Sequence, residues 1–256
     1  NNINMTCRVS NLTLKSSNLK ASVDYYTKYL GFKVVSDVEG KQTSLSFGPV
    51  ATHATLTLVQ AGKDYEIGKA YGHIALISRD IYKTCEQITA SGGNVSRPPG
   101  PVKGGTTVIA FVSDPDGYKI ELISRDDTWK CNFLHIMVRI GDLERTKKFY
   151  TSLGAYSTRT TKNEKYKYDL MFLGFGEERD TTVLEFTYNW GQTEYDHGNT
   201  HKGFTFASTD LSKTLETIKG CVSDAPAIAK VDGVSQFTIT DPDGYDITFV
   251  SEADLK

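Results

Sequence analysis

The chain has 256 residues, 39% hydrophobic and 23% charged, which is enough for two domains with packed cores. Its net charge of −2, with Lys and Arg dispersed along the chain, argues against nucleic acid or an anionic membrane as a partner. No apolar run reaches the roughly 18 residues of a membrane span. The first residues also lack the pattern of a targeting peptide, so we expect a cytoplasmic protein, or a plastid one if such a peptide was removed.

Four helix signatures follow one another along the chain, each opening with Asn or Asp as a cap and closing near a glycine. They cover residues 18–31, 80–92, 142–154 and 210–220. The segments between them are short and rich in β-branched and aromatic residues, which predicts strands. The clearest of these cover 55–59, 107–113, 183–188 and 235–240.

The chain contains an internal repeat. The phrase DPDGY starts at 114 and again at 241, and NLKASVDYYTKYLG at 18–31 resembles DLERTKKFYTSLG at 142–154. We therefore predict a duplicated domain, with domain 1 at residues 1–128 and domain 2 at 129–256. Each half contains two helix signatures, so the fold class is α+β, built from four β-α-β-β-β modules.

Two connecting segments have sequences that predict their conformation. In DPDG, proline fixes φ and glycine accepts left-handed geometry, so both copies are interpreted as tight turns between strands, not as catalytic aspartates. The stretch RPPGPVKGG at 97–105 is expected to be a surface loop able to close over a ligand.

The cysteines form no CxxC pair, which favours reduced thiols over a disulfide framework or a thiolate metal site. They are Cys7, Cys85, Cys131 and Cys221. Any metal must then use His, Asp or Glu.

Two histidines and two glutamates are the best candidates for such a site. His73 opens the predicted strand HIALI and His135 lies in FLHIMVRI, whereas Glu121 interrupts KIELI and Glu185 interrupts VLEFTY. A carboxylate within an apolar strand is costly to bury unless it is paired or bound to a metal. Together the four residues predict an N2O2 site for a divalent transition metal.

The remaining histidines are less informative. His197 and His201 are four residues apart in the polar segment EYDHGNTHKG, and we expect them to lie in a solvated loop. His53 has no acidic neighbour in the sequence and is expected to be structural or exposed.

Several long motifs resemble the glyoxalase I family of the vicinal oxygen chelate superfamily, in its fused two-domain form. They are LHIMVRIGDLERTKKFYTSLGA, EKYKYDLMFLGFG, VLEFTYNWG, YGHIAL and GPVKGGTTVIAFVSDPDGYKIEL. The resemblance covers nearly the whole chain. It implies that the metal ligands are His73, Glu121, His135 and Glu185.

The same alignment yields no ligands in the first and fourth modules. Counting from matching motifs places Asn11 at the position of His135, Thr55 at that of Glu185, Phe204 at that of His73, and Thr248 at that of Glu121. We therefore predict one complete site and one degenerate site. Only pairing of module two with three, and of one with four, collects all four ligands in one of the two sheet-lined cavities.

The resemblance implies a lactoylglutathione lyase, which isomerises the hemithioacetal of methylglyoxal and glutathione to S-lactoylglutathione. Glu121 is the first choice for the catalytic base, with Glu185 as its counterpart. Arg139 and Asn189 match positions that hold the carboxylate end of glutathione, and Lys103 is a weaker candidate for contact with the substrate. The short modules resemble the nickel-activated bacterial members of the family, and this resemblance implies Ni(II), with Co(II) or Zn(II) as alternatives.

Two other functions remain open at this point. An Fe(II) dioxygenase of the same superfamily would use two histidines and one carboxylate, which Glu185 argues against. A non-catalytic small-molecule binding protein on the same scaffold would be consistent with the loss of one site. A fused chain already supplies both halves of each cavity, so a monomer is expected.

Overall fold

The structure is a computed structural model that describes residues 7–201, 203–220, 222 and 226–255. The first module comprises β1 (Cys7–Ser16), α1 (Leu19–Leu30), β2 (Lys33–Val38), β3 (Gln42–Ser46) and β4 (Thr55–Gln60). The second comprises β5 (Tyr71–Ile77), α2 (Ile81–Ala90), β6 (Asn94–Pro101), β7 (Val108–Ser113) and β8 (Lys119–Ile123).

The second half repeats this order. The third module comprises β9 (Phe133–Ile140), α3 (Leu143–Ser152), β10 (Tyr156–Asn163), β11 (Tyr168–Gly174) and β12 (Val183–Asn189). The fourth comprises β13 (Gly203–Ser208), α4 (Leu211–Lys219), β14 (Ala229–Val231), β15 (Val234–Thr240) and β16 (Asp246–Ser251), followed by the 3-10 turn η1 (Glu252–Asp254). The predicted α+β fold with four β-α-β-β-β modules is therefore confirmed.

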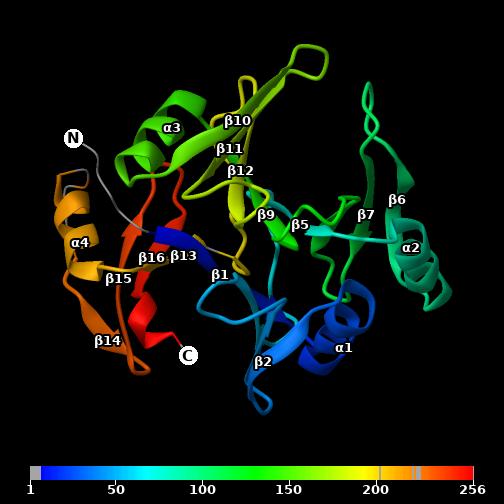
Figure 1. Ribbon diagram of the computed structural model, residues 1–256, viewed down its shortest axis with the longest axis horizontal. Coiled ribbons are helices and arrows are strands. Elements are labelled where there is room, and N and C mark those ends of the chain that lie inside the picture. Colours follow the sequence, from blue (N-terminus) through cyan, green and yellow to red (C-terminus); the bar gives the residue numbers. More distant parts are fainter. Residues whose placement is uncertain (1–6, 202, 221, 223–225, 256) are drawn as a thin grey trace.

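The helices begin where the cap residues predict. The side chains of Asn18, Asp80, Asp142 and Asp210 each accept a hydrogen bond from a backbone N–H in the first turn of α1 to α4, respectively. Each helix buries one apolar stripe, for example Leu211, Leu215 and Ile218 in α4. All four helices lie on the outside of the molecule (Figure 1).

The strands form two eight-stranded sheets that exchange modules between the two halves of the chain. One sheet has the order β14-β15-β16-β13-β1-β4-β3-β2 and combines modules one and four, and the other has the order β10-β11-β12-β9-β5-β8-β7-β6 and combines modules two and three. The predicted module pairing is thus confirmed. We call them the 1–4 sheet and the 2–3 sheet.

The segment between the two halves contains the predicted domain boundary. Residues 124–132 separate β8 from β9 and contain neither helix nor strand. The boundary between residues 128 and 129 itself stays a prediction.

Both DPDG phrases are turns, as predicted, and they tie one sheet to the helix of the other. Asp114 accepts hydrogen bonds from the backbone N–H groups of Asp116 and Tyr118 and from the hydroxyl of Tyr26 in α1. Burial raises the pKa of Asp114 to about 7. In the second copy Asp241 makes the equivalent bonds to Asp243, Tyr245 and Tyr150. These turns are therefore structural.

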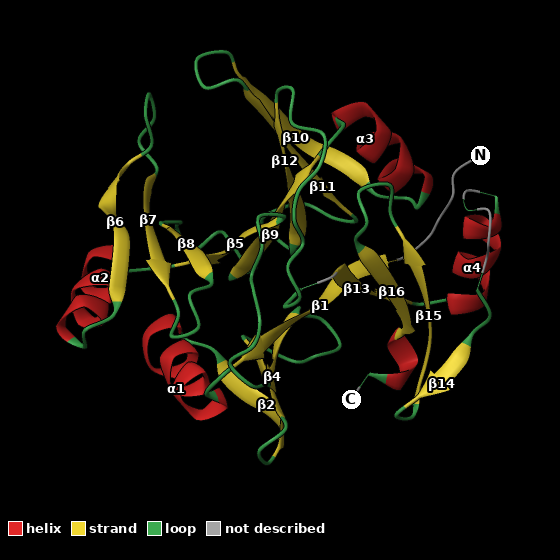
Figure 2. Cartoon of the chain, turned by 180° about the vertical axis from the view of Figure 1, so that it is seen from behind, coloured by secondary structure: helices red, strands yellow, loops and turns green. Residues whose placement is uncertain are grey.

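The expectation for residues 97–105 needs a correction. Residues up to Pro101 belong to β6, since Arg97 pairs with Phe111 and Pro101 with Val108 in β7. Only residues 102–107 form the connecting loop. The β6–β7 and β10–β11 hairpins project to the same side of the molecule (Figure 2).

Cys7, Cys85 and Cys131 are buried free thiols, and Cys221 lies outside the described residues. In the part of the chain that the structure describes, no helix has the length and hydropathy needed to cross a membrane.

The segments that carry the chain from one sheet to the other cross at two glycines. Gly68 and Gly198 both have positive φ, +71° and +58°. The N–H groups of Lys69 and Ala70 both donate to the carbonyl of Asp196 beside this crossing. A Cβ on Gly68 would meet the backbone nitrogen of Gly198, and one on Gly198 would meet the carbonyl of Glu66.

A non-glycine residue in the left-handed conformation destabilises a protein by about 1–2 kcal/mol. We expect Gly68→Ala and Gly198→Ala to lower the free energy of unfolding by more than this, because the added Cβ also meets backbone atoms. Urea unfolding measures this effect. Gly40→Ala is the matched control, because Gly40 has φ +66° but open space around its Cβ position. An equal decrease in the free energy of unfolding for all three variants would show that the close approach of the crossing segments does not add to the destabilisation.

Candidate metal centre

The 2–3 sheet brings together the four side chains that the sequence singled out. His73 lies on β5, Glu121 on β8, His135 on β9 and Glu185 on β12. One ligand atom from each lies within 4.8 Å of the others, although His73 and Glu185 are 112 residues apart in the chain. The strand register explains this, since β12 pairs with β9, β9 with β5, and β5 with β8.

The donor atoms surround a common point. The Nε2 atom of His135 lies 2.8 Å from an Oε2 of Glu185 and 3.5 Å from that of Glu121. The Nε2 atom of His73 lies 3.3 Å from Glu121 and 3.9 Å from Glu185. Ligands bound to one metal at about 2.0–2.2 Å are separated by roughly 3 to 4 Å, so the spacing fits a single divalent cation.

Hydrogen bonding supports the same conclusion. Both Nε2 atoms are buried and neither has a hydrogen-bond partner, since even the short contact between His135 and Glu185 lacks hydrogen-bond geometry. A buried polar atom without a partner is costly. A cation at the common point would satisfy both nitrogens and both carboxylates.

Burial and neighbouring charges shift the pKa values of His135, Glu121 and Glu185. Burial opposes the charge on His135, but Glu185 and Glu121 raise its pKa to about 9. Burial also opposes ionisation of Glu121, yet the two imidazoles hold the pKa of that carboxyl well below its usual range. The pKa of Glu185 is lowered mainly by His135, again against burial. The two carboxylates therefore stabilise positive charge beside them, whether it is a proton on His135 or a bound cation.

The centre opens into a cavity of about 750 Å³. Arg139, Asn189 and Lys103, the predicted substrate-binding residues, all line it. The Nη1 atom of Arg139 donates to the carbonyls of Lys69 and Tyr71, which leaves Nε and Nη2 free for a carboxylate. Asn189 donates to the hydroxyl of Tyr195.

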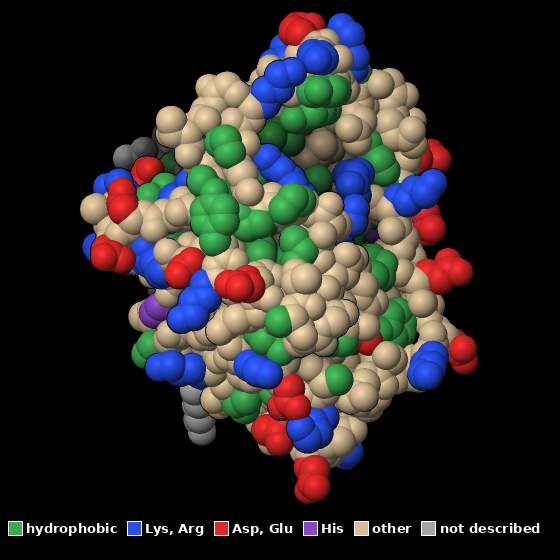
Figure 3. Space-filling view, turned by 90° about the vertical axis from the view of Figure 1, so that its right-hand side faces the viewer, with side chains coloured by type: hydrophobic (Ala, Val, Ile, Leu, Met, Phe, Trp, Pro, Cys, Tyr) green, Lys and Arg blue, Asp and Glu red, His purple; other side chains and the backbone are tan. Residues whose placement is uncertain are grey.

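Sequence reasoning missed two further cations in this cavity, Arg97 and Lys165. Arg97 lies on β6, in the stretch that the sequence predicts to be a loop. Lys165 lies at the tip of the β10–β11 hairpin, and only the alternation of charged and aromatic residues in EKYKY hinted at it. Lys and Arg side chains border the hollow in the upper part of Figure 3.

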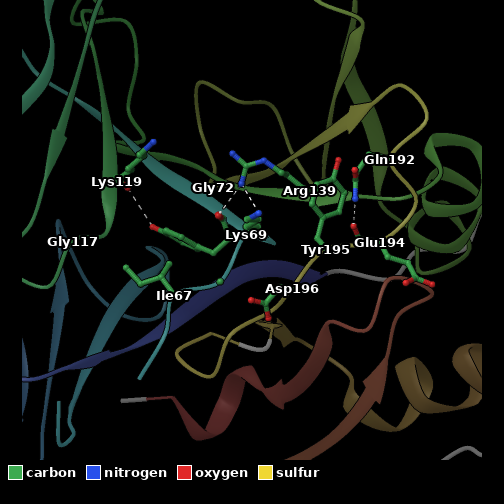
Figure 4. A pocket seen from close by; sticks show the side chains of 12 residues that line it. Ile67, Lys69, Gly72, Gly117, Lys119, Arg139, Gln192, Glu194, Tyr195 and Asp196 are labelled. Atoms are coloured by element: carbon green, nitrogen blue, oxygen red, sulfur yellow. Dashed lines mark hydrogen bonds between the residues drawn. The ribbon is translucent and has the colours of Figure 1, made fainter. Parts of the chain in front are cut away.

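A second pocket of about 750 Å³ adjoins the first and shares Arg139 with it. In Figure 4, Arg139 lies between Gly72 and Tyr195, with Lys69 and Lys119 nearby. The second pocket thus lies at the start of β5 and β8, where Tyr71, Gly72 and Lys119 line it.

The 1–4 sheet has no comparable cluster among the described residues. In the 2–3 sheet, His135 and Glu121 are both cross-strand neighbours of Ala75. In the 1–4 sheet, Asn11 and Thr248 are both cross-strand neighbours of Thr205. The predicted equivalences of Asn11 and Thr248 therefore agree with the register.

The other two predicted equivalences are wrong. Glu185 pairs with Met137, which lies two residues after His135. In the 1–4 sheet the residue two positions after Asn11 is Thr13, and it pairs with Thr57. Thr57, and not Thr55, therefore occupies the position of Glu185. The count failed because Thr57 precedes His73 by 16 positions, whereas Glu185 precedes Gly203 by 18.

Phe204 pairs with Ile247 as Ile74 pairs with Ile120, so Gly203 occupies the position of His73. Phe204 is buried in the core, where its ring contacts His201 and Tyr245. Successive residues of a strand point to opposite faces, which is why Phe204 faces the core.

The expectation for the other histidines is also corrected. His201 is buried rather than solvated, and His197 is half-buried with its Nε2 2.9 Å from the carbonyl oxygen of Asp243. Neither belongs to the metal-ligating cluster.

The chain matches the Glyoxalase/Bleomycin resistance protein/Dioxygenase superfamily over residues 8–122 and 132–249. It is 39% identical to the probable chloroplastic lactoylglutathione lyase of Arabidopsis thaliana, over 97% of this chain and 74% of the relative. A lactoylglutathione lyase of Escherichia coli O157:H7 is 48% identical over 47% of this chain and 94% of its own length. The crystal structure of glyoxalase I from Zea mays superposes with a TM-score of 0.90 at 37% identity, covering 98% of this chain and 94% of that one.

Proposed function

Because the chain belongs to the Glyoxalase/Bleomycin resistance protein/Dioxygenase superfamily, we propose that His73, Glu121, His135 and Glu185 form its one metal-dependent active site. The predicted function, lactoylglutathione lyase, is confirmed by relatives of that name along nearly the whole chain. The chain is therefore an enzyme of the glyoxalase I type. The main support for this site is that ligand atoms from four strands, in two modules, lie close together.

The substrate that we propose is the hemithioacetal formed by methylglyoxal and glutathione. Its isomerisation to S-lactoylglutathione moves a proton between two adjacent carbons, and a bound divalent cation would stabilise the charge that develops on their two oxygens. We assign the proton transfer to Glu121, which accepts the proton from one carbon and returns it to the next.

The geometry favours Glu121 over Glu185 as the base. The Glu185 carboxylate lies 2.8 Å from His135 and its side chain is 7% exposed, whereas Glu121 lies no closer than 3.3 Å to either imidazole and is 13% exposed toward the cavity. Glu121 is therefore the less confined of the two carboxylates. Glu185 remains its counterpart on the other side of the centre.

Arg139 and Asn189 are proposed to hold the carboxylate end of glutathione, with Lys103 at the mouth of the cavity. The free Nε and Nη2 atoms of Arg139 match the fork that a carboxylate accepts. Arg97 and Lys165 add positive charge to the same cavity, which suits an anionic thiol.

We propose Ni(II) as the metal, with Co(II) or Zn(II) as alternatives, because nitrogen and oxygen donors without thiolate suit all three ions. Each sheet draws both of its halves from one chain, which supports a monomer. The compartment is proposed to be the cytoplasm, or a plastid in view of the chloroplastic relative.

The test is to strip the protein of metal, reload it with Ni(II), Co(II), Zn(II) or Fe(II), and follow thioester formation from methylglyoxal and glutathione by its ultraviolet absorbance. We expect no turnover without metal and the highest turnover with Ni(II). Absence of thioester with every ion, at one bound ion per chain, would contradict the proposed function. Oxygen consumption with Fe(II), without thioester formation, would favour the dioxygenase.

A further inference from the structure

Two phenylalanines stand beside the two histidines of the metal centre. The ring of Phe111 lies 5.4 Å from that of His73 at an interplanar angle of 79°. The ring of Phe172 lies 5.4 Å from that of His135, also at 79°. Such edge-to-face contacts restrict rotation of an imidazole.

Each phenylalanine is also the cross-strand neighbour of a metal-ligating glutamate. Phe111 on β7 pairs with Glu121 on β8, and Phe172 on β11 pairs with Glu185 on β12. Modules two and three thus each supply a matching set of one His, one Glu and one Phe. The outer side of Phe172 is covered by Arg159, whose guanidinium lies 3.8 Å from the ring centroid.

The 1–4 sheet provides an internal comparison. There Thr238 pairs with Thr248 as Phe111 pairs with Glu121, and Ser44 pairs with Thr57 as Phe172 pairs with Glu185. In both pairs the two hydroxyl oxygens lie 2.9 Å apart. The sheet that lacks the His and Glu ligands therefore also lacks both aromatic rings.

We infer that Phe111 and Phe172 are positioning residues of the metal centre, which hold the imidazoles of His73 and His135 so that both Nε2 atoms point to the common site. The inference rests on the metal centre proposed above. Metal-ligating histidines need their orientation fixed by neighbouring groups. Here the rings confine each imidazole and offer no hydrogen-bonding atom that would compete for its Nε2, which is consistent with the unpartnered state of both nitrogens.

The test measures Co(II) affinity by chelator competition and the visible absorption spectrum of the Co(II) protein. Phe111→Leu and Phe172→Leu keep an apolar side chain but remove the ring. We expect each to weaken Co(II) binding about tenfold and to alter the ligand-field bands. Phe111→Tyr keeps the ring, and its hydroxyl has room because Phe111 lines the cavity. We therefore expect its Co(II) affinity and spectrum to be close to those of the wild type.

Phe237→Leu is the matched control. Phe237 is 3% exposed, as is Phe172, and packs on Phe249 in the 1–4 sheet, so its loss measures the general cost of removing a buried ring. We expect it to lower the melting temperature without changing Co(II) affinity or the spectrum. If the wild type binds Co(II) and both Leu variants bind it equally well with unchanged bands, the positioning role is contradicted. If the wild type itself binds no Co(II), the metal centre is contradicted as well.

Discussion

Replacement of Glu121 by Gln is expected to lower kcat about 10²- to 10⁴-fold while the variant still binds metal. Glutamine keeps the size of the side chain and an oxygen atom that can face the cation. It cannot accept the proton that the isomerisation must move between two carbons. Steady-state kinetics on fully loaded protein, with metal content measured on the same samples, tests this directly.

Two further variants separate proton transfer from general disturbance. Glu185→Gln, compared at equal metal occupancy, is expected to lose less activity, because Glu185 is the more confined carboxylate. Glu216→Gln removes a carboxylate that pairs with Lys219 at 2.6 Å on α4, outside the ligand cluster, and is expected to retain near wild-type kcat. A Glu121→Gln enzyme with full occupancy and unchanged kcat would show that another group moves the proton.

Replacement of Arg139 by Lys is expected to raise KM for the hemithioacetal about 10- to 100-fold, with a smaller change in kcat. A charge-assisted hydrogen bond contributes about 1.5–3 kcal/mol, and lysine keeps the charge but loses the fork. Loss of Nη1 also removes its bonds to the carbonyls of Lys69 and Tyr71, so thermal unfolding has to accompany the kinetics.

The control for Arg139 uses the substrate. Two glutathione analogues are used, one without the γ-glutamyl carboxylate and one without the glycyl carboxylate. The hemithioacetal that lacks the carboxylate held by Arg139 is expected to bind the wild type weakly and to make wild type and Arg139→Lys nearly equal. If the variant discriminates between glutathione and both analogues as strongly as the wild type, Arg139 holds neither carboxylate.

Local signals in the sequence predicted the modules well. Each helix begins after an Asn or Asp cap, and each DPDG phrase forms the turn that its proline and glycine dictate. The module pairing was also predictable, because only one arrangement gathers His73, Glu121, His135 and Glu185 in one place.

The two wrong equivalences, Thr55 and Phe204, come from counting residues between motifs across connections of unequal length. A separation of 16 rather than 18 positions shifted the inferred position from Thr57 to Thr55. Phe204 was assigned to the cavity although an apolar residue next to Gly203 on the same strand must face the core. Neither Phe111 nor Phe172 was singled out, because a phenylalanine in a strand is typical of any core, and only the register shows it beside a ligand.

One cation is expected to bind per chain, in the 2–3 sheet and not in the 1–4 sheet. Anomalous diffraction from crystals of the Ni(II)-loaded protein locates it. The structure predicts one strong peak per chain, within bonding distance of His73, Glu121, His135 and Glu185. A peak beside Asn11, Thr57 and Thr248, or a peak that none of the four ligands contacts, would contradict it.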